Sequence, residues 1–400
     1  MLKGKTVVLG VTGSIAAYKI ANLASMLVKL HAEVHVIMTE NATQFINPIT
    51  FETLTNHKCL VETFDRNFQF HVAHVSLAQQ ADLMLIAPAS ANVIGKLANG
   101  IADDMLTTTA MACTAPMLIS PAMNTHMYEN PIVQDNLQKL KRFGMTIIDP
   151  AVGFLACRDV GAGKMPDPEV LLSHIIHTIG YPKDLANKKV LITAGPTREK
   201  IDPVRFISNY STGKMGYELA KAAMLRGGKV TLISGPVHLD PIPFLSTIMV
   251  ESANEMYEAV MKEQEQQDIL ILSAAVADYK PTVIADEKIK KKDGDASIEL
   301  TRTKDILSQL GALKSEHQYL CGFSMETEHL IENSAAKREK KNADMIVANS
   351  LREEGAGFGV DTNIVTILTK TDQVQLPLMD KEQVAHRILD QILKNSTVEQ

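Results

Sequence analysis

The stretch Asn187 to Gly216, NKKVLITAGPTREKIDPVRFISNYSTGKMG, has the pattern of the first residues of a domain, although it lies near the middle of the chain. A polar entry leads into the apolar, β-prone run Val190 to Thr193, and a Gly-Pro turn and a polar loop then open a helix after Met215. The N-terminal stretch Lys3 to Lys19, KGKTVVLGVTGSIAAYK, repeats this order of polar entry, strand, glycine-containing turn and helix. The chain therefore begins twice, which predicts two domains.

The boundary between the predicted domains falls where Gly180 and Pro182 end a helical segment and a short polar stretch follows. We predict domains at residues 1–181 and 188–400, with a linker at 182–187. A chain of 400 residues suits two domains of roughly 200 residues each.

The composition is that of a globular protein, with 46% hydrophobic and 22% charged residues. The net charge of −6 argues against a nucleic-acid surface, which needs clustered Lys and Arg to replace the counterions of phosphates. The sequence has no run of 18 uncharged apolar residues, and its first apolar segment is too short for a signal peptide, so we expect a cytoplasmic protein. We expect four free thiols, since the spacing of the cysteines is neither CxxC nor that of a small disulfide-rich domain: Cys59, Cys113, Cys157 and Cys321.

Strand-like and helix-like segments alternate through both halves, which predicts an α/β fold with two doubly wound, Rossmann-like domains. Ligands of such sheets bind at the carboxyl ends of the strands. The predicted strands are Thr6–Val11, Glu33–Met38, Asp82–Ala87, Pro116–Ile119 and Thr146–Ile148 in the first half, and Val190–Thr193, Val230–Ser234, Ile269–Ser273, Tyr319–Phe323 and Met345–Ala348 in the second.

Small and polar residues follow the predicted strands of the first half. Gly13 lets backbone N–H groups approach an anion, and Ser14 is placed to cap the next helix, although an ordinary turn explains this piece equally well. We expect Pro88 and Pro121 to end two strands at one edge of the sheet. Each proline is followed by small residues and an asparagine, which predicts a cradle for a flat ligand. The polar residues at these strand ends are Thr39, Ser90, Asn92 and Asn124, of which Asn124 is also suited simply to cap a helix.

Two further side chains of the first half are candidates for chemistry. His74 lies three residues after His71, a spacing that fits a metal, but the sequence offers no third ligand and a structural histidine is the more common case. Cys157 lies in VGFLACRDVGAGKM, whose glycines predict a flexible flap, and its basic neighbours favour a reactive thiol.

The second half lacks the common nucleotide motifs. The segment Ser211 to Lys214 is not a P-loop, because Ser208 and Met215 stand where that motif requires Gly and Ser or Thr. No GxGxxG follows the first strand of either half, which argues against a plain NAD-dependent oxidoreductase. Asn209 and Lys214 are instead hydrogen-bond donors near a helix N-terminus, suited to a substrate phosphate or carboxylate, unless the loop is only a capped surface turn.

Charged residues gather later in this half. Asp278 follows a strand, and a lysine run begins at Lys288; such a run is usually solvated surface, but a metal at Asp278 and lysines on a triphosphate form a coherent alternative. Lys337 and Lys341 lie four residues apart, on one helix face. Phe323 closes a strand and is placed to stack on a base.

Taken together, the motifs of the first half are similar to those of the flavin-containing cysteine decarboxylase family. The segments that carry this resemblance are TGSIAAYK, FHVAHVSLAQQAD, PASANVIGKLANGIADD, PAMN and ACRDVGAGKM. The second half resembles a phosphopantothenate–cysteine ligase, through AGPTREKIDPVRFISNYSTGKMG, SAAVADY, KIKKK, GFSMET and KREKKNAD. Over essentially the whole chain the sequence is thus similar to the bifunctional phosphopantothenoylcysteine decarboxylase/phosphopantothenate–cysteine ligase family of coenzyme A biosynthesis.

For the first half the resemblance implies a flavoprotein-type parallel sheet and a decarboxylase that uses FMN. Oxidation of the cysteine CH2–SH to a thioaldehyde makes an electron sink β to the carboxylate, and the enethiol left by decarboxylation is then reduced again. The implied roles are His74 as base or orienting group, Asn124 as carboxylate contact and Cys157 as proton donor. The implied FMN contacts are Gly13, Ser14, Thr39, Ser90 and Asn92.

For the second half the resemblance implies that CTP activates 4′-phosphopantothenate as an acyl nucleotide, which cysteine then attacks. Asn209 would contact the acyl intermediate and Lys288 would stabilise the charge of nucleotidyl transfer. The implied nucleotide-binding residues are Asp278, Lys288, Phe323, Lys337 and Lys341, with Mg²⁺ or another divalent cation at Asp278. The residues themselves do not distinguish CTP from ATP.

The resemblance also implies a homo-oligomer, built from decarboxylase trimers and ligase dimers and reaching a dodecamer or a similar assembly. A non-enzymatic flavin-binding regulatory protein is the competing class, since relatives of the first half include such members. That class should lack the cysteine flap or the ligase motifs, and this sequence has both.

Overall fold

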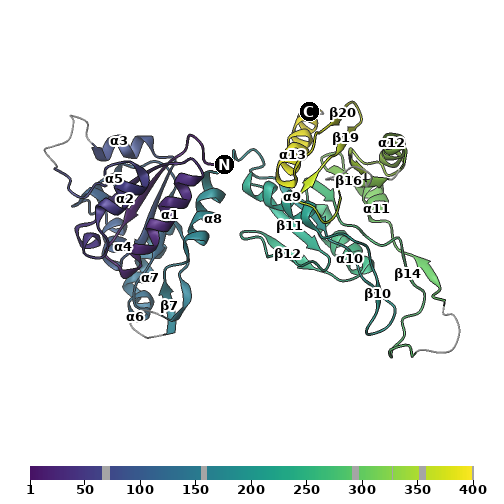
Figure 1. Cartoon of the computed structure of the whole chain (residues 1–400), viewed down its shortest axis with the longest axis horizontal. Helices are drawn as coiled ribbons and strands as arrows, with labels where there is room; N and C mark the ends of the chain where they lie inside the picture. Colours follow the sequence, from purple (N-terminus) through teal and green to yellow (C-terminus); the bar gives the residue numbers. More distant parts are fainter. Residues whose placement is uncertain (65–72, 155–159, 291–296, 327, 351–356, 399–400) are drawn as a thin grey trace. The chain divides into compact units, whose positions relative to one another are not determined.

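The computed structural model describes residues 1–64, 73–154, 160–290, 297–326, 328–350 and 357–398 (Figure 1). Its contacts divide the chain into two compact units, Met1–Pro182 and Lys183–Gln400. Among the helices of the described ranges, none is long and apolar enough to cross a membrane.

The first unit is built on a five-stranded sheet in the order β2-β1-β3-β4-β5, in which all neighbouring strands are parallel. Its strands are β1 (Thr6–Val11), β2 (Glu33–Met38), β3 (Leu83–Ala89), β4 (Met117–Pro121) and β5 (Thr146–Ile147). Its helices are η1 (Ile15–Ala17), α1 (Tyr18–Lys29), η2 (Glu40–Gln44), α2 (Pro48–Thr55), α3 (Ala73–Gln80), α4 (Ala91–Ala98), α5 (Met105–Ala112), α6 (Thr125–Glu129), α7 (Pro131–Arg142) and α8 (Pro168–Ile179). A hairpin of β6 (Ala151–Phe154) and β7 (Val160–Lys164) completes the unit.

Alternation along β1 explains why helices cover both faces of this sheet. Val7 and Leu9 belong to a core shared with α1 and α8, whereas Val8 belongs to a second core shared with α4, α5 and α7. Successive side chains of a strand point to opposite faces, so a strand that is apolar at every position needs cover on both sides. The structure therefore confirms the predicted doubly wound α/β class.

The expectation that a proline ends each strand is wrong for Pro88 and confirmed for Pro121. β3 continues through Pro88 to Ala89, with a shift of register against β4 between Ile86 and Ala89, and β4 includes Pro121 as its last residue. Proline has no backbone N–H, but its carbonyl group can still accept a hydrogen bond. The carbonyl of Pro88 accepts one from the Thr12 hydroxyl at 2.6 Å. Proline is tolerated wherever no strand needs its missing N–H.

The second unit contains an eight-stranded sheet in the order β12-β11-β8-β13-β16-β17-β19-β20. Its strands are β8 (Lys189–Ala194), β11 (Lys229–Ser234), β12 (Ser246–Met249), β13 (Ile269–Leu272), β16 (Tyr319–Glu326), β17 (Met345–Ser350), β19 (Thr366–Thr369) and β20 (Gln373–Gln375). The first six are parallel, and in order of sequence they read 3-2-1-4-5-6, the Rossmann arrangement. β19 and β20 extend the sheet antiparallel, an extension that the sequence analysis did not predict.

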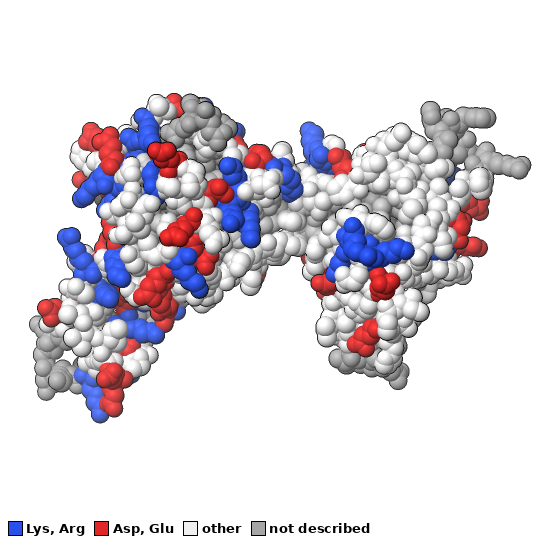
Figure 2. All heavy atoms as spheres, turned by 180° about the vertical axis from the view of Figure 1, so that it is seen from behind, with Lys and Arg blue, Asp and Glu red and all other residues white. Residues whose placement is uncertain are grey.

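The remaining elements of this unit are helices and short hairpins around the sheet. They are β9 (Glu199–Lys200), β10 (Phe206–Ile207), α9 (Lys214–Leu225), α10 (Ala253–Glu263), η3 (Gln264–Gln266), β14 (Tyr279–Pro281), β15 (Leu300–Arg302), α11 (Ile306–Leu313), α12 (Leu330–Lys340), β18 (Thr362–Asn363), β21 (Met379–Asp380) and α13 (Lys381–Val398). Figure 2 shows acidic and basic side chains interspersed over the visible face of the second unit. On that face the charge is thus mixed rather than gathered into a single basic stripe.

Candidate active sites of the two units

The first unit has a cavity of about 480 Å³ at the carboxyl ends of β1, β3 and β4. The cavity brings together four residues that the sequence analysis selected, at three different strand ends: Gly13, Ser14, Ser90 and Asn124. Lys19 and Lys164 also line the cavity, and the remaining lining residues are mostly apolar: Ile15, Ala16, Tyr18, Ala91, Ala122, Met123, Met127, Gly163 and Met165. Apolar walls with a few polar groups suit a flat aromatic ring that carries a polar tail.

Thr12, a buried residue that the sequence analysis did not select, connects two of these strand ends. Its hydroxyl donates to Pro88 O at 2.6 Å and accepts from the backbone N–H of Ser90 at 2.9 Å. Both hydrogen-bonding capacities of this buried hydroxyl are therefore used, which satisfies the usual requirement for buried polar groups. The result is a fixed position for Ser90 relative to the end of β1. A hydroxyl directly after an apolar strand was the only sequence signal for this role.

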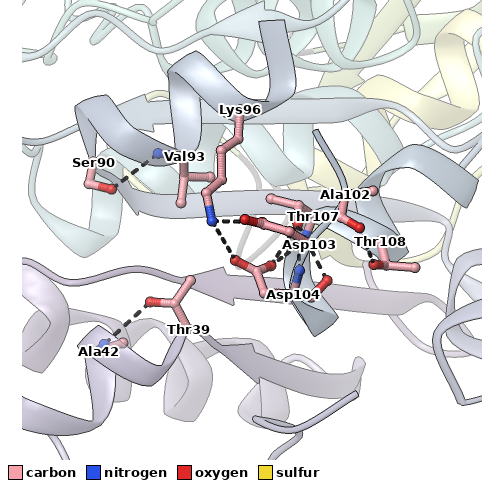
Figure 3. Close-up of polar contacts among 10 residues, drawn as sticks. All are labelled: Thr39, Ala42, Ser90, Val93, Lys96, Ala102, Asp103, Asp104, Thr107 and Thr108. Atoms are coloured by element: carbon pink, nitrogen blue, oxygen red, sulfur yellow. Dashed lines mark hydrogen bonds and ion pairs between the residues drawn. The ribbon is translucent and has the colours of Figure 1, made fainter. Parts of the chain in front are cut away.

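The polar residues at the strand ends also cap helices. Ser14 accepts from Ala16 N at 3.3 Å, Thr39 from Ala42 N at 3.3 Å and Asn124 from His126 N at 2.9 Å. Ser90 likewise accepts from Val93 N at 3.4 Å, and Figure 3 shows this cap together with that of Thr39. The simple capping interpretation and the binding-site interpretation therefore apply to the same residues, because a capped helix start also directs N–H groups toward the sheet edge.

Gly13 is required by close packing. A Cβ atom at this position would lie 2.8 Å from Cβ of Asn41, closer than real side chains approach. Glycine thus allows the loop after β1 to lie against the segment that follows β2.

Three other predicted residues of this half lie outside the lining of this cavity. Among the described lining residues there is no Thr39, Asn92 or His74: Thr39 caps η2, Asn92 is exposed on α4 and His74 is half-buried on α3. Cys157 lies outside the described residues, so the structure gives no position for it.

The acidic pair at the end of the motif PASANVIGKLANGIADD has a structural role. Lys96 on α4 contacts Asp103 at 2.7 Å and Asp104 at 3.4 Å, and Asp104 forms a capping box with Thr107 (Figure 3). The hydrogen bond that Lys96 donates to Asp103 raises the pKa of Lys96, which keeps this amine charged. These contacts join the end of α4 to the start of α5.

The β6–β7 hairpin packs directly against one wall of the cavity. Met123 N donates to Gly163 O at 3.1 Å, and a Cβ atom at Gly163 would overlap the carbonyl oxygen of Met123. Gly163 also has a φ of +127°, which L side chains rarely adopt. This glycine of the predicted flap therefore serves close packing, and Gly163, Lys164 and Met165 form part of the cavity lining.

In the second unit, two cavities share a wall at the carboxyl ends of β8, β13 and β16. This is where the strand order reverses, the usual ligand position of such sheets. The larger cavity, of about 500 Å³, brings together four predicted residues: Asp278, Phe323, Lys337 and Lys341. The smaller, of about 290 Å³, shares three of them and extends to the loop at Ser211 and Lys214.

Four basic and two acidic residues line the larger cavity, and its two lysines from the segment after β16 have carboxylates as neighbours. Lys337 donates to Phe323 O at 2.9 Å; burial lowers the pKa of Lys337, and the carboxylates of Glu326, Asp305 and Asp278 oppose that shift. Lys341 forms an ion pair with Asp305 at 2.5 Å. An anion that enters this cavity would meet both amines.

Sequence reasoning missed two basic residues that line the same cavity, Arg302 and Lys304. Arg302 is the last residue of β15, and Lys304 lies two residues further on. β15 pairs with β14, which begins directly after Asp278. Lys304 also lies over the ring of Tyr257, 4.4 Å from its centroid. The basic character of the segment TRTK, just beyond the lysine run, was the available signal.

Asn209 is held within a network of loop contacts. Its side-chain amide donates to Ala275 O at 2.6 Å, and its oxygen accepts from Ser211 N at 3.2 Å. It lines a separate cavity of about 380 Å³ that also reaches Ser211 and Lys214. Lys214 is paired with Asp361 at 2.7 Å. Asn209 thus fixes the loop between β10 and α9 against the loop that follows β13.

Lys288 is exposed and is not among the described residues that line these three cavities. Its neighbour Ile289 is anchored, because its N–H donates to the buried Asp202 at 3.1 Å and its carbonyl accepts from Arg205 at 2.9 Å. The hydrogen bond from Arg205 is the main reason that the pKa of Asp202 is strongly lowered. The start of the lysine run is therefore tied to the loop between β9 and β10.

The two sheets and their cavities define a protein with two α/β domains of the kind that bind flavins and nucleotides. Residues 1–180 match the family model described as Flavoprotein, and residues 185–396 match that of the DNA/pantothenate metabolism flavoprotein C-terminal domain. The chain is 49% identical over 398 residues to the Coenzyme A biosynthesis bifunctional protein CoaBC of Bacillus subtilis (strain 168), covering 98% of this chain and 97% of the relative. It is 40% identical over 395 residues to the protein of the same name from Escherichia coli (strain K12), covering 98% and 97%.

A solved structure, the C-terminal domain of a Coenzyme A biosynthesis bifunctional protein CoaBC, is 46% identical to this chain and has a TM-score of 0.45, covering 52% of this chain and 96% of its own. From the full-length matches, the chain belongs to the family of bifunctional coenzyme A biosynthesis proteins. It is a bifunctional enzyme, a decarboxylase joined to a ligase, and the non-enzymatic alternative is not favoured.

Proposed function

We propose that the second unit joins 4′-phosphopantothenate to cysteine with CTP, and that the first unit decarboxylates the product to 4′-phosphopantetheine with FMN. The observation that carries the proposal is the grouping of predicted residues. Four residues selected for FMN and substrate line one cavity of the first unit, and four selected for the nucleotide line one cavity of the second.

The cavity of the first unit fits FMN in its chemistry. Its apolar residues would lie against the ring system, and the N–H groups at the start of η1 would face the phosphate, with Ser14 and Gly13 beside it. FMN, when bound, supplies the hydride acceptor and donor that the reaction needs. The chain's residues bind the substrate, exclude water and deliver protons.

We propose three residues for the decarboxylation. Asn124, on the cavity wall beside Gly163, would hold the substrate carboxylate through its amide. Cys157, which lies between β6 and β7 in the sequence and outside the described residues, would donate the proton in the final reduction. His74 would orient the substrate from α3, and Thr39 and Asn92 would add contacts to FMN from outside the described lining.

We propose that the larger cavity of the second unit holds CTP. Lys337 and Lys341 would contact phosphate oxygens, Phe323 would stack on the base, and Asp278 would bind Mg²⁺ between the phosphates. A volume of about 500 Å³ lies in the range of small-molecule sites. Lys288, on an exposed but anchored stretch, would stabilise charge during nucleotidyl transfer, and Asn209 would contact the acyl intermediate.

The flavin part of the proposal has a direct test. The purified protein should be yellow and should release FMN on denaturation. A colourless protein that cannot be reconstituted with FMN would refute this part. Cys157→Ser should still release CO2 but stall before the reduced product, and a fully active variant would exclude Cys157 as the proton donor.

The ligase part is tested by the release of pyrophosphate. Release from CTP should require both 4′-phosphopantothenate and cysteine, and Mg²⁺ removal should abolish it. Asn209→Asp should impair this reaction and spare the decarboxylase, because a carboxylate would face Ala275 O at the present distance of 2.6 Å. Pyrophosphate release without 4′-phosphopantothenate would argue against the acyl-nucleotide route.

We also propose a homo-oligomer with decarboxylase trimers and ligase dimers. Light scattering on the purified protein measures its mass directly. A monomer at working concentrations would contradict this proposal.

A further inference from the structure

Glu33, His35 and His57 form a cluster at the start of β2, away from the cavity of the first unit. Glu33 is the first residue of β2 and pairs with Thr6, the first residue of β1, so the cluster lies at the amino-terminal edge of a parallel sheet. Glu33 and His35 are two residues apart on the strand and therefore lie on the same face. His57 comes from the segment after α2.

The position of His57 is fixed by backbone contacts beside the edge strand. Met38 N donates to Leu60 O at 2.8 Å and Leu60 N donates to Val36 O at 3.0 Å, so the segment after His57 runs parallel to β2. Nδ1 of His57 lies 3.1 Å from Val34 O. A hydrogen bond from one ring nitrogen to a backbone carbonyl is the usual support of a metal-binding histidine, because it aims the other nitrogen at the metal.

The three side chains have the spacing of a metal site. Nε2 of His57 lies 2.9 Å from Oε1 of Glu33, Nε2 of His35 lies 3.9 Å from the same oxygen, and the three ligand atoms all lie within 4.8 Å of one another. Ligands of a tetrahedral zinc ion stand ~3.3 Å apart, for bonds of about 2.0–2.1 Å. The observed distances lie on either side of this value, so small rotations would suffice.

Electrostatics also favours a cation between these groups. With its Nδ1–H on Val34 O, a neutral His57 directs the lone pair of Nε2 toward the carboxylate of Glu33, which is repulsive unless a positive charge lies between them. A proton between His57 and Glu33 would remove the repulsion in that pair alone. A metal ion would also bind His35, whose ring centroid lies 4.3 Å from that of His57.

We propose that Glu33, His35 and His57 bind a divalent transition-metal ion of the zinc type, with one coordination position open to water. Two imidazole nitrogens and a carboxylate oxygen are ligands that such ions prefer over Mg²⁺ or Ca²⁺. The ion would tie the edge strand β2 to the segment at His57. Its place at the edge opposite the cavity gives it a stabilising rather than a catalytic role.

The test measures zinc bound to the full-length, FMN-loaded protein after removal of metals, by equilibrium dialysis with metal analysis. Wild type should bind one more zinc ion per chain than His57→Asn or Glu33→Gln, and zinc should raise its thermal transition more than theirs. His31→Asn is the matched control, since His31 is exposed two residues before Glu33 and its φ of 63° suits asparagine. This control should bind zinc as wild type does.

Several results would overturn the proposal. Equal zinc binding by wild type and Glu33→Gln would show that zinc uses other groups and that the cluster is only a histidine–carboxylate contact. Displacement of the extra zinc by millimolar Mg²⁺ would exclude ligation by the two imidazoles. The FMN content of each variant shows whether it has folded, and Glu33→Gln, an exposed and isosteric change, keeps the test valid if His57→Asn does not fold.

Discussion

Replacement of Gly163 by alanine should loosen the hairpin that walls the cavity of the first unit. A Cβ atom there would overlap the carbonyl oxygen of Met123, far inside the ordinary contact range of 3.4–4 Å, and the backbone has a φ of +127°. Residues held in such a conformation cost about 1–3 kcal/mol, and an overpacked contact costs a similar amount. Gly163→Ala should therefore destabilise this arrangement by roughly 2–5 kcal/mol.

The strain should be relieved locally, by separation of β7 from Met123 and loss of the 3.1 Å hydrogen bond between Met123 N and Gly163 O. That movement displaces part of the cavity lining, so the dissociation constant of FMN should rise at least about tenfold, the equivalent of about 1.4 kcal/mol. FMN binding is the better readout, because it reports on the first unit alone, whereas a melt of a two-unit chain combines the unfolding of both units.

The matched control is Gly153→Ala on the paired strand β6. A Cβ atom at Gly153 meets only the Lys164 side chain, at 3.8 Å, an ordinary contact. This variant should bind FMN within about twofold of wild type, since an unstrained surface change has little effect. Equal FMN affinity of the two variants would refute the argument that close packing at Met123 requires Gly163.

Three further predictions concern the second unit. Arg226→Lys should lower the unfolding free energy of this unit by about 1–2 kcal/mol, because lysine cannot reproduce the two-pronged contact of Arg226 with Asp184. The magnitude is low because the Asp184 side chain is 42% exposed. An unchanged thermal or denaturant melt would contradict this prediction. Burial lowers the pKa of Lys381 to about 8. Between pH 8 and about 10.4 the unfolded chain therefore binds more protons than the folded chain, and the unfolding free energy of wild type should rise with pH relative to that of Lys381→Met. Denaturant melts across this pH range measure the difference, and parallel profiles of the two proteins would contradict the prediction. Asp305→Asn keeps a side-chain oxygen to cap α11 but removes the charge that pairs with Lys341. The KM for CTP should therefore fall several-fold at low salt, and less at high salt, where the charges are screened. An unchanged or higher KM would argue against phosphate binding by Lys341.

The sequence predicted ten of the eleven parallel strands of the two sheets and missed β12. The predicted bounds of β1 and β2 agree with the structure, and the others differ by one to three residues at one or both ends. Buried parallel strands are continuous apolar runs, a local signal that a sequence displays directly. The missed strands β12 and β20 are the two edge strands of the second sheet, and their mostly exposed side chains give no apolar run. β19, a buried run of only four residues, was missed as well.

The candidate sites were predictable only in part. Selecting polar residues after strands identified Ser90 and Asn124, since parallel strands end at one edge of a sheet. The same rule selected Thr39, which caps a helix outside the lining of the cavity. It missed Arg302 and Lys304, which reach the nucleotide cavity through the pairing of β15 with β14. Pairing between segments that are distant in sequence leaves no local pattern.

The stretch at 187–216 shows the division between the two kinds of information. By itself the sequence determined that a second α/β domain begins there and that a polar loop follows its first strand, because apolar runs and turn residues are local properties. Only the tertiary structure decided what that loop contacts: Asn209 binds Ala275 O and Lys214 pairs with Asp361. The physical reason is that hydrogen bonds and ion pairs form between groups that the sheet order brings together, and sheet order depends on burial over the whole domain.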